Sequence, residues 1–288
     1  MKTTKLAVLC LAMLGTTIFA QEEISTVASL NKLGDNALNG VTLPPMDLTG
    51  YKPTGLMLKG AKCGAVTGMT VAMLQDLAEE GLEGTQLPRM DLTGYKPRGK
   101  QLVGADLRLT TGLTVEMLQD FEDNQLDRVV LPEMDLTGYK PTGQMLQGAI
   151  LTKTTGLTVE ILQSLPDQGL KGVTLPEMDL TGYMPTGNML QSANLKKTWG
   201  LTQEMLSNLG PEGLFEFEAP AMDMSGMDFT DKNLNSVDFT LVTGLTAQQL
   251  AQCRNLRNAD LRDTGITESD LLKAGMEPEQ IEGAEFER

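Results

Sequence analysis

Apolar residues recur at every fifth position through long stretches of the chain. In one such stretch they are Leu131, Leu136, Pro141, Leu146 and Leu151. A period of five fits neither the 3.6-residue period of an α-helix nor the two-residue period of a β-strand. It predicts short extended sides that are separated by corners, with glycine or threonine at the bends.

A helical pattern interrupts these stretches. The segment 158–165 begins with Thr158, a favourable N-cap residue, and places Ile161, Leu162 and Leu165 on one face. This pattern predicts a helix of two or three turns, which needs neighbouring structure to be stable. Further helices are predicted over 70–80 and 266–275.

The two patterns alternate within a repeat of 44 residues. The motif Leu-Pro-x-Met-Asp-Leu-Thr-Gly-Tyr begins at Leu43, Leu87, Leu131 and Leu175, and a degenerate copy begins at Ala219. One unit is too small to enclose a core, so we expect stacked copies to cover one another. Strands stack at about 4.8 Å and helices at about 8–10 Å, which predicts two rungs per helix and a nearly straight rod.

Short blocks within each copy resemble the pentapeptide-repeat family, whose pattern is Ala-Asp/Asn-Leu-x-x. Such blocks begin at Ala105, Ala193 and Ala259, and variants with phenylalanine surround Phe229 and Phe239. The resemblance implies a right-handed, four-sided β-helix with the central Leu or Phe pointing inward. We therefore predict a mainly β solenoid with inserted short helices, a pentapeptide-type β-helix with two rungs per repeat. A leucine-rich horseshoe is the rival fold.

The N-terminus has the features of a secretory signal peptide. Residues 1–20 combine a basic start, a short apolar centre and a small residue at the predicted cleavage point, after Ala20. Residues 21–276 form a single repeat array, and 277–288 an acidic C-terminal cap or tail. An uncleaved anchor is the alternative for 1–20, and no later segment is long enough to span a bilayer. The sequence thus predicts a secreted or periplasmic protein.

Composition narrows the possible functions. Removing Lys2 and Lys5 with the signal peptide takes the formal charge from −15 to −17, which disfavours a nucleic-acid partner. The chain has no histidine, so the commonest general base and transition-metal ligand is absent. We predict no catalytic residue, no cofactor and no metal. Cys63 and Cys253 are expected to be buried free thiols.

Residues that recur at 44 positions should form columns along the stack. The three columns are Tyr51, Tyr95, Tyr139 and Tyr183; Asp47, Asp91, Asp135, Asp179 and Asp223; and Lys52, Lys96 and Lys140. The tyrosines are expected to pack beneath the helices, with stacking on a glycan or partner side chain as the alternative. The aspartates are expected to be solvated or to cap corners, with calcium between rungs as the alternative. The lysines are expected to be solvated, or to orient a partner. Trp199 replaces Thr155 of the previous copy and is expected to mark local packing.

These features favour a non-enzymatic secreted scaffold that binds an unknown protein or glycan partner. One alternative is a DNA-mimicking topoisomerase inhibitor, which the family resemblance and the acidic charge imply together. A carbohydrate-active solenoid enzyme is the other.

Overall fold

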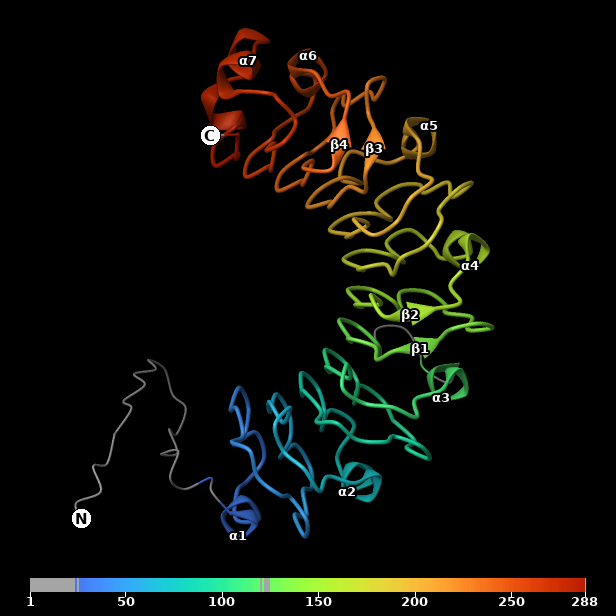
Figure 1. The fold of residues 1–288 in the computed structure, drawn as a ribbon, viewed down its shortest axis with the longest axis vertical. Helices are drawn as coiled ribbons and strands as arrows, with labels where there is room; N and C mark the ends of the chain where they lie inside the picture. The colour runs from blue at the N-terminus through green and yellow to red at the C-terminus, as the bar shows by residue number, and fades with distance from the viewer. Residues whose placement is uncertain (1–23, 25, 120, 122–124, 288) are drawn as a thin grey trace, which may run out of the picture.

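The computed structural model describes Ile24, residues 26–119, Phe121 and residues 125–287. The predicted signal peptide lies outside these residues. The chain forms an open arc, and the two ends of the repeat array lie at its two tips (Figure 1). In the described ranges no helix has the length and apolar character needed to cross a membrane.

Short elements follow one another along the arc. The helices are α1 (Val27–Leu30), α2 (Val71–Gln75), α3 (Val115–Gln119), α4 (Val159–Gln163), α5 (Gln203–Leu206), α6 (Ala247–Leu250), α7 (Glu268–Lys273) and the 3-10 helix η1 (Pro278–Gln280). The strands are β1 (Met134–Asp135), β2 (Thr154–Thr155), β3 (Met222–Asp223) and β4 (Val242–Thr243).

Isolated parallel bridges connect the chain to itself at regular separations. Thr42 is bridged to Lys62, 20 residues on, and Lys62 to Gln86, 24 residues on; the same alternation continues as far as Asp238. Each 44-residue repeat therefore makes two coils, a shorter one and a longer one that contains the helix. The last bridge joins Asp260 to Glu285, so the segment predicted as a cap or tail contributes a final paired residue.

The prediction of a mainly β solenoid, and with it of a right-handed pentapeptide-type β-helix, is wrong. In the described chain, regular strand is limited to two two-stranded parallel sheets, β1–β2 and β3–β4, and each strand has two residues. The remainder consists of short helices, turns and single bridges. The corners explain this result, because a bend at about every fifth residue leaves only one or two residues on each side free to pair.

One corner recurs in every coil with a residue at positive φ. These residues are Gly40, Gly60, Gly84, Gly104, Arg128, Gly148, Gly172, Ser192, Glu216, Ser236, Asn258 and Gly283. The backbone N–H at this corner bonds to the next coil, as when Gly60 N donates to Glu83 O at 2.8 Å and Gly84 N to Val103 O at 2.8 Å. Glycine is favoured here because other L-residues are strained at positive φ.

The five-residue pattern corresponds to the interior. Leu136, Leu146 and Leu151 are fully buried, and they belong to a single apolar cluster that runs the length of the array. Burying a leucine side chain stabilises a fold by about 1.5–3 kcal/mol. Stacking the copies therefore supplies the core that one unit lacks.

The helix predicted over 158–165 is confirmed as α4. Thr158 Oγ1 accepts a hydrogen bond from Ile161 N at 3.4 Å, and Leu162 is buried. The predicted helix over 70–80 is shorter than expected, because α2 ends at Gln75. Leu77 is bridged to Gly55, and Ala78 N donates to Gly55 O at 2.9 Å. This pairing returns the chain to the stack before the helix can continue.

The prediction of a nearly straight rod is also wrong, since the array curves and α2, α3, α4 and α5 lie along its outer rim (Figure 1). Among the described helices, only α6 and α7 share a substantial contact. Helices without substantial contact with one another cannot impose the spacing on which the prediction relied.

Backbone hydrogen bonds show which rim is the inner one. Among the described residues of the first four copies, the backbone hydrogen bonds that link one copy to the next lie in two places. They lie at the row of isolated bridges that includes Lys62–Gln86, and at the glycine-rich corner. On the helix side, side chains make the links, as when Gln119 Nε2 donates to Lys140 O at 3.2 Å. The continuous ladder keeps the coils close together, so it lies on the inner rim of the arc.

Candidate functional site

The inner rim presents one row of side chains to solvent. We call it the ladder face: the bridged residues together with those residues two positions after them that are not buried. The latter are Pro44, Gly64, Arg108, Thr152, Lys196, Thr240, Arg262 and Glu287. The bridged residues are Thr42, Lys62, Gln86, Asp106, Val130, Ile150, Thr174, Asn194, Glu218, Asp238, Asp260 and Glu285. None of them is buried, so the row is available to a partner.

The ladder face is where the copies differ from one another. The motif Met-Asp-Leu-Thr-Gly-Tyr that follows it is identical in four copies, whereas the bridged positions carry apolar, neutral polar, basic and acidic residues. The core restrains only the residue that follows each bridged position, because Leu43 and its equivalents are buried. The core does not dictate the residue type at the bridged positions, and solvent can reach them. Such positions are where a repeat protein can vary its binding surface.

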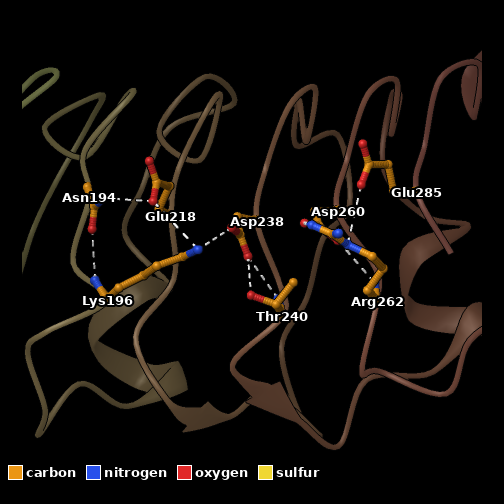
Figure 2. Close-up of polar contacts among 8 residues, drawn as sticks. All are labelled: Asn194, Lys196, Glu218, Asp238, Thr240, Asp260, Arg262 and Glu285. Carbon is orange, nitrogen blue, oxygen red and sulfur yellow. Dashed lines mark hydrogen bonds and ion pairs between the residues drawn. The ribbon is translucent and has the colours of Figure 1, made fainter. Parts of the chain in front are cut away.

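In the C-terminal part of the array, polar contacts connect the ladder residues from coil to coil (Figure 2). Asn194 Nδ2 donates to Glu218 Oε2 at 2.7 Å. Lys196 Nζ lies 3.7 Å from Glu218 Oε2 and forms a closer ion pair with Asp238, two coils away. The side chains of three coils are thus held in one arrangement.

A second group continues the row. Thr240 Oγ1 donates to Asp238 Oδ1 at 2.6 Å. Arg262 Nε donates to Asp260 Oδ1 at 2.9 Å and lies 3.3 Å from Glu285 Oε2. Figure 2 shows these side chains lying side by side across successive coils. An ordered surface loses less side-chain entropy when a partner binds.

These contacts also set the charge of the row. Burial opposes ionisation of Asp238, but hydrogen bonds from Lys196 and Thr240 outweigh it and lower the pKa of that carboxyl. The hydrogen bond from Arg262 is the largest influence on Asp260 and lowers its pKa as well. Burial also opposes the charge of Lys196, yet Asp238 raises its pKa. Both carboxylates are therefore ionised at neutral pH, and they can accept hydrogen bonds but cannot donate protons.

The ladder face ends in a hollow at the C-terminal tip of the arc. Its volume is about 830 Å³, and it is lined by Thr240, Arg262, Asp263, Glu285, Phe286 and Glu287. Four of these six residues belong to the ladder face. The row of polar side chains therefore leads into a concave surface.

The structure places the tyrosine column inside the array. Tyr51 is 1 % exposed, and Tyr95, Tyr139 and Tyr183 are fully buried. Of the two interpretations that the sequence leaves open, the structure supports packing, because buried rings cannot stack on a glycan. Only Tyr95 has a hydrogen-bond partner for its hydroxyl, at 2.8 Å from Gln101 Oε1; those of Tyr51, Tyr139 and Tyr183 have none in the described structure.

The aspartate column forms corners. Asp135 Oδ1 accepts hydrogen bonds from Thr137 N at 2.9 Å and Thr137 Oγ1 at 2.7 Å, and the hydrogen bonds from Thr137 lower the pKa of this carboxyl. Asp47, Asp91 and Asp179 have the same contacts with the threonine two residues on. Asp223 accepts from Ser225 N. Within the described ranges, no group of three or more acidic or cysteine side chains is placed to hold a metal ion.

The lysine column lies beside the helices. Lys52, Lys96 and Lys140 are exposed, and no ion pair joins any of them to another described residue. Asn31 Oδ1 accepts from Lys52 N at 2.9 Å, which ties this column to the helix side. The structure therefore does not bring the tyrosine, aspartate and lysine columns together into one site.

Sequence reasoning missed the ladder face because it searched for identities between copies. Lys196, Glu218, Asp238, Asp260 and Arg262 break the repeat and so form no column. The signal that could have found them is the contrast between core residues that are always apolar, such as Leu131, and the variable residue just before each of them.

Comparisons with known proteins add no relative: no protein-family model matches the chain, and no curated protein matches it.

Proposed function

We propose that this chain is a non-enzymatic, exported repeat scaffold that binds a partner through its ladder face. The observation that carries the proposal is the divergence of the copies at ladder positions that are not buried, beside core residues that are always apolar and mostly leucine. Curved repeat arrays commonly bind partners on their concave surface. The contacts of Lys196 and Arg262 support the proposal further, because they order the side chains that a partner would meet.

The absence of histidine from the sequence favours binding over catalysis. The pKa values of the Asp238 and Asp260 carboxyls are lowered, so these two groups lack the raised pKa that a general acid needs. Export rests on residues 1–20, and it predicts that the mature chain begins at Gln21. The mass of the exported protein checks this cleavage.

A ladder variant tests the proposal. Val130→Thr, Ile150→Asn and Glu218→Thr each introduce a residue that another copy carries at a ladder position, so we expect the fold to be retained. The control Glu160→Gln removes one negative charge, as the ladder variant does, but from α4 on the outer rim.

The measurement is quantitative cross-linking in the native compartment followed by mass spectrometry. We expect the ladder variant to lose the partners that the wild type and the control recover. Equal recovery by all three proteins, with circular dichroism showing intact folds, contradicts a binding role for this face.

A further inference from the structure

Trp199 stands in a column that is exposed in every copy. The equivalent residues are Thr67, Thr111, Thr155 and Thr243, and all four are exposed. Trp199 is 49 % exposed and is the only tryptophan of the chain. The expectation that it marks local packing is therefore wrong. Since threonine suffices for the fold at this position, the indole has a different use.

The backbone of Trp199 is held in place on both sides. Trp199 is bridged to Asp179, and Leu180 N donates to Trp199 O at 2.7 Å. The bridge places Trp199 and Asp179 next to each other on adjacent coils. Hydrogen bonds from Thr181 are the main cause of the lowered pKa of the Asp179 carboxyl, so a permanent negative charge lies on the coil beside the exposed ring.

A second departure from the repeat occurs in the same copy. Met184 is 36 % exposed and replaces the lysine found as Lys52, Lys96 and Lys140. One copy thus loses a positive charge and gains two exposed apolar side chains. Exposed tryptophan is a typical anchor residue of protein interfaces, where its burial contributes much of the binding energy.

The chemistry around the ring selects the partner group. The face of an indole is electron-rich and attracts cations within about 6 Å of its centre. Asp179 is the bridge partner of Trp199 on the adjacent coil, and the chain carries a formal charge of −15. We propose that Trp199 is the anchor for a basic segment of a partner polypeptide, whose arginine or lysine side chain stacks on the indole beside Asp179.

This surface is separate from the ladder face. Trp199 pairs with the aspartate column, whereas Asn194 and Lys196 of the same coil belong to the ladder face. Either proposal can fail without the other, and the ladder variant distinguishes them.

Binding can be followed by the fluorescence of Trp199, because it is the only tryptophan of the chain. Purified full-length protein is titrated with the blocked peptide Gly-Arg-Gly-Arg-Gly, and Trp199 fluorescence is recorded; the control peptide carries uncharged citrulline at both arginine positions. We expect a saturable change in fluorescence, with a Kd about fivefold or more lower for the arginine peptide. An equal Kd for the two peptides, or no saturable change up to the solubility limit, overturns the proposal.

Trp199→Thr is the matched variant, because it restores the residue of four other copies. Binding of the arginine peptide to this variant is measured by calorimetry, after circular dichroism confirms the fold. We expect its preference for arginine over citrulline to disappear. If Trp199→Thr keeps the wild-type preference, or if the ladder variant instead abolishes it, the anchor is not Trp199.

Discussion

The four tyrosines allow a comparison inside one molecule. All are buried at equivalent places, yet only the Tyr95 hydroxyl has a hydrogen bond, to Gln101 at 2.8 Å. At the position of Gln101 the other copies have Met57, Met145 and Met189. The Gln101 amide group is also fixed from two sides, since Arg98 N donates to its oxygen at 2.9 Å and its nitrogen donates to Ala78 O at 3.0 Å.

Removing the hydroxyl should therefore have opposite effects in two copies. A buried polar group without a partner costs about 1–3 kcal/mol, whereas a satisfied hydrogen bond contributes about 0.5–1.5 kcal/mol. We expect Tyr139→Phe to raise the free energy of unfolding and Tyr95→Phe to lower it. The two variants should differ by about 1.5–4.5 kcal/mol, the sum of these two ranges.

Urea unfolding followed by circular dichroism measures this difference from the midpoints at a common slope. A second variant sharpens the test: Met145→Gln supplies the acceptor that Tyr139 lacks, so Tyr139→Phe should become destabilising in that background. If Tyr95→Phe and Tyr139→Phe lower the stability equally in the wild-type background, the reasoning fails, because the hydroxyls would then have equivalent surroundings.

The same column predicts loss of stability in alkali. Burial raises the pKa of Tyr51 to about 12, and the nearby Cys63 adds to the shift. An unfolded tyrosine titrates near 10. Between these values Tyr51 releases its proton in the unfolded chain and retains it in the folded one. The contribution of Tyr51 to stability is therefore full below about pH 10 and falls as the pH approaches 12. Tyr51→Phe should flatten this part of the curve.

Two further predictions concern the corners and the thiols. Gly156→Ala should be more destabilising than Gly182→Ala: both glycines have φ near +80°, but a Cβ at 156 would lie 2.2 Å from Asp135 Oδ1 and 2.4 Å from Thr137 N, whereas nothing lies within 4 Å at 182. Urea unfolding of the pair checks this, and equal losses would mean that backbone strain alone decides. Cys63 and Cys253 are buried free thiols, and burial raises the pKa of each to about 12. A thiol reagent at pH 8 should label them only after urea is added; rapid labelling of either in the native protein contradicts their placement.

Much of the architecture could be predicted from the chain because the responsible interactions are local. The apolar positions at every fifth residue are buried, and Thr158 is the N-cap residue of α4, as predicted. The corner function of Asp135 is also local, since its partner Thr137 is two residues away. Patterns of this kind depend on neighbours within a few positions, and a sequence displays them directly.

The predictions that failed depended on distances between coils. The predicted strand content was too high. The five-residue pattern shows which residues point inward, but it does not show how many residues pair with the adjacent coil before the chain reaches a corner. The straight rod assumed that helices pack against each other, whereas the side chains of Gln119 and Gln163 make links along the outer rim. No local pattern contains the spacing of helices that lie in different copies.

By itself, the sequence determined the 44-residue repeat, the apolar interior and the places where the chain turns, because each of these follows from residues that lie near one another or recur in register. Only the tertiary structure decided which exposed positions form a common surface. Lys196 meets Asp238 across 42 residues, and Trp199 meets Asp179 across 20. Such pairs exist only because the coils stack at a spacing set by backbone bonds, and the register of the bridges brings the variable ladder residues onto one face.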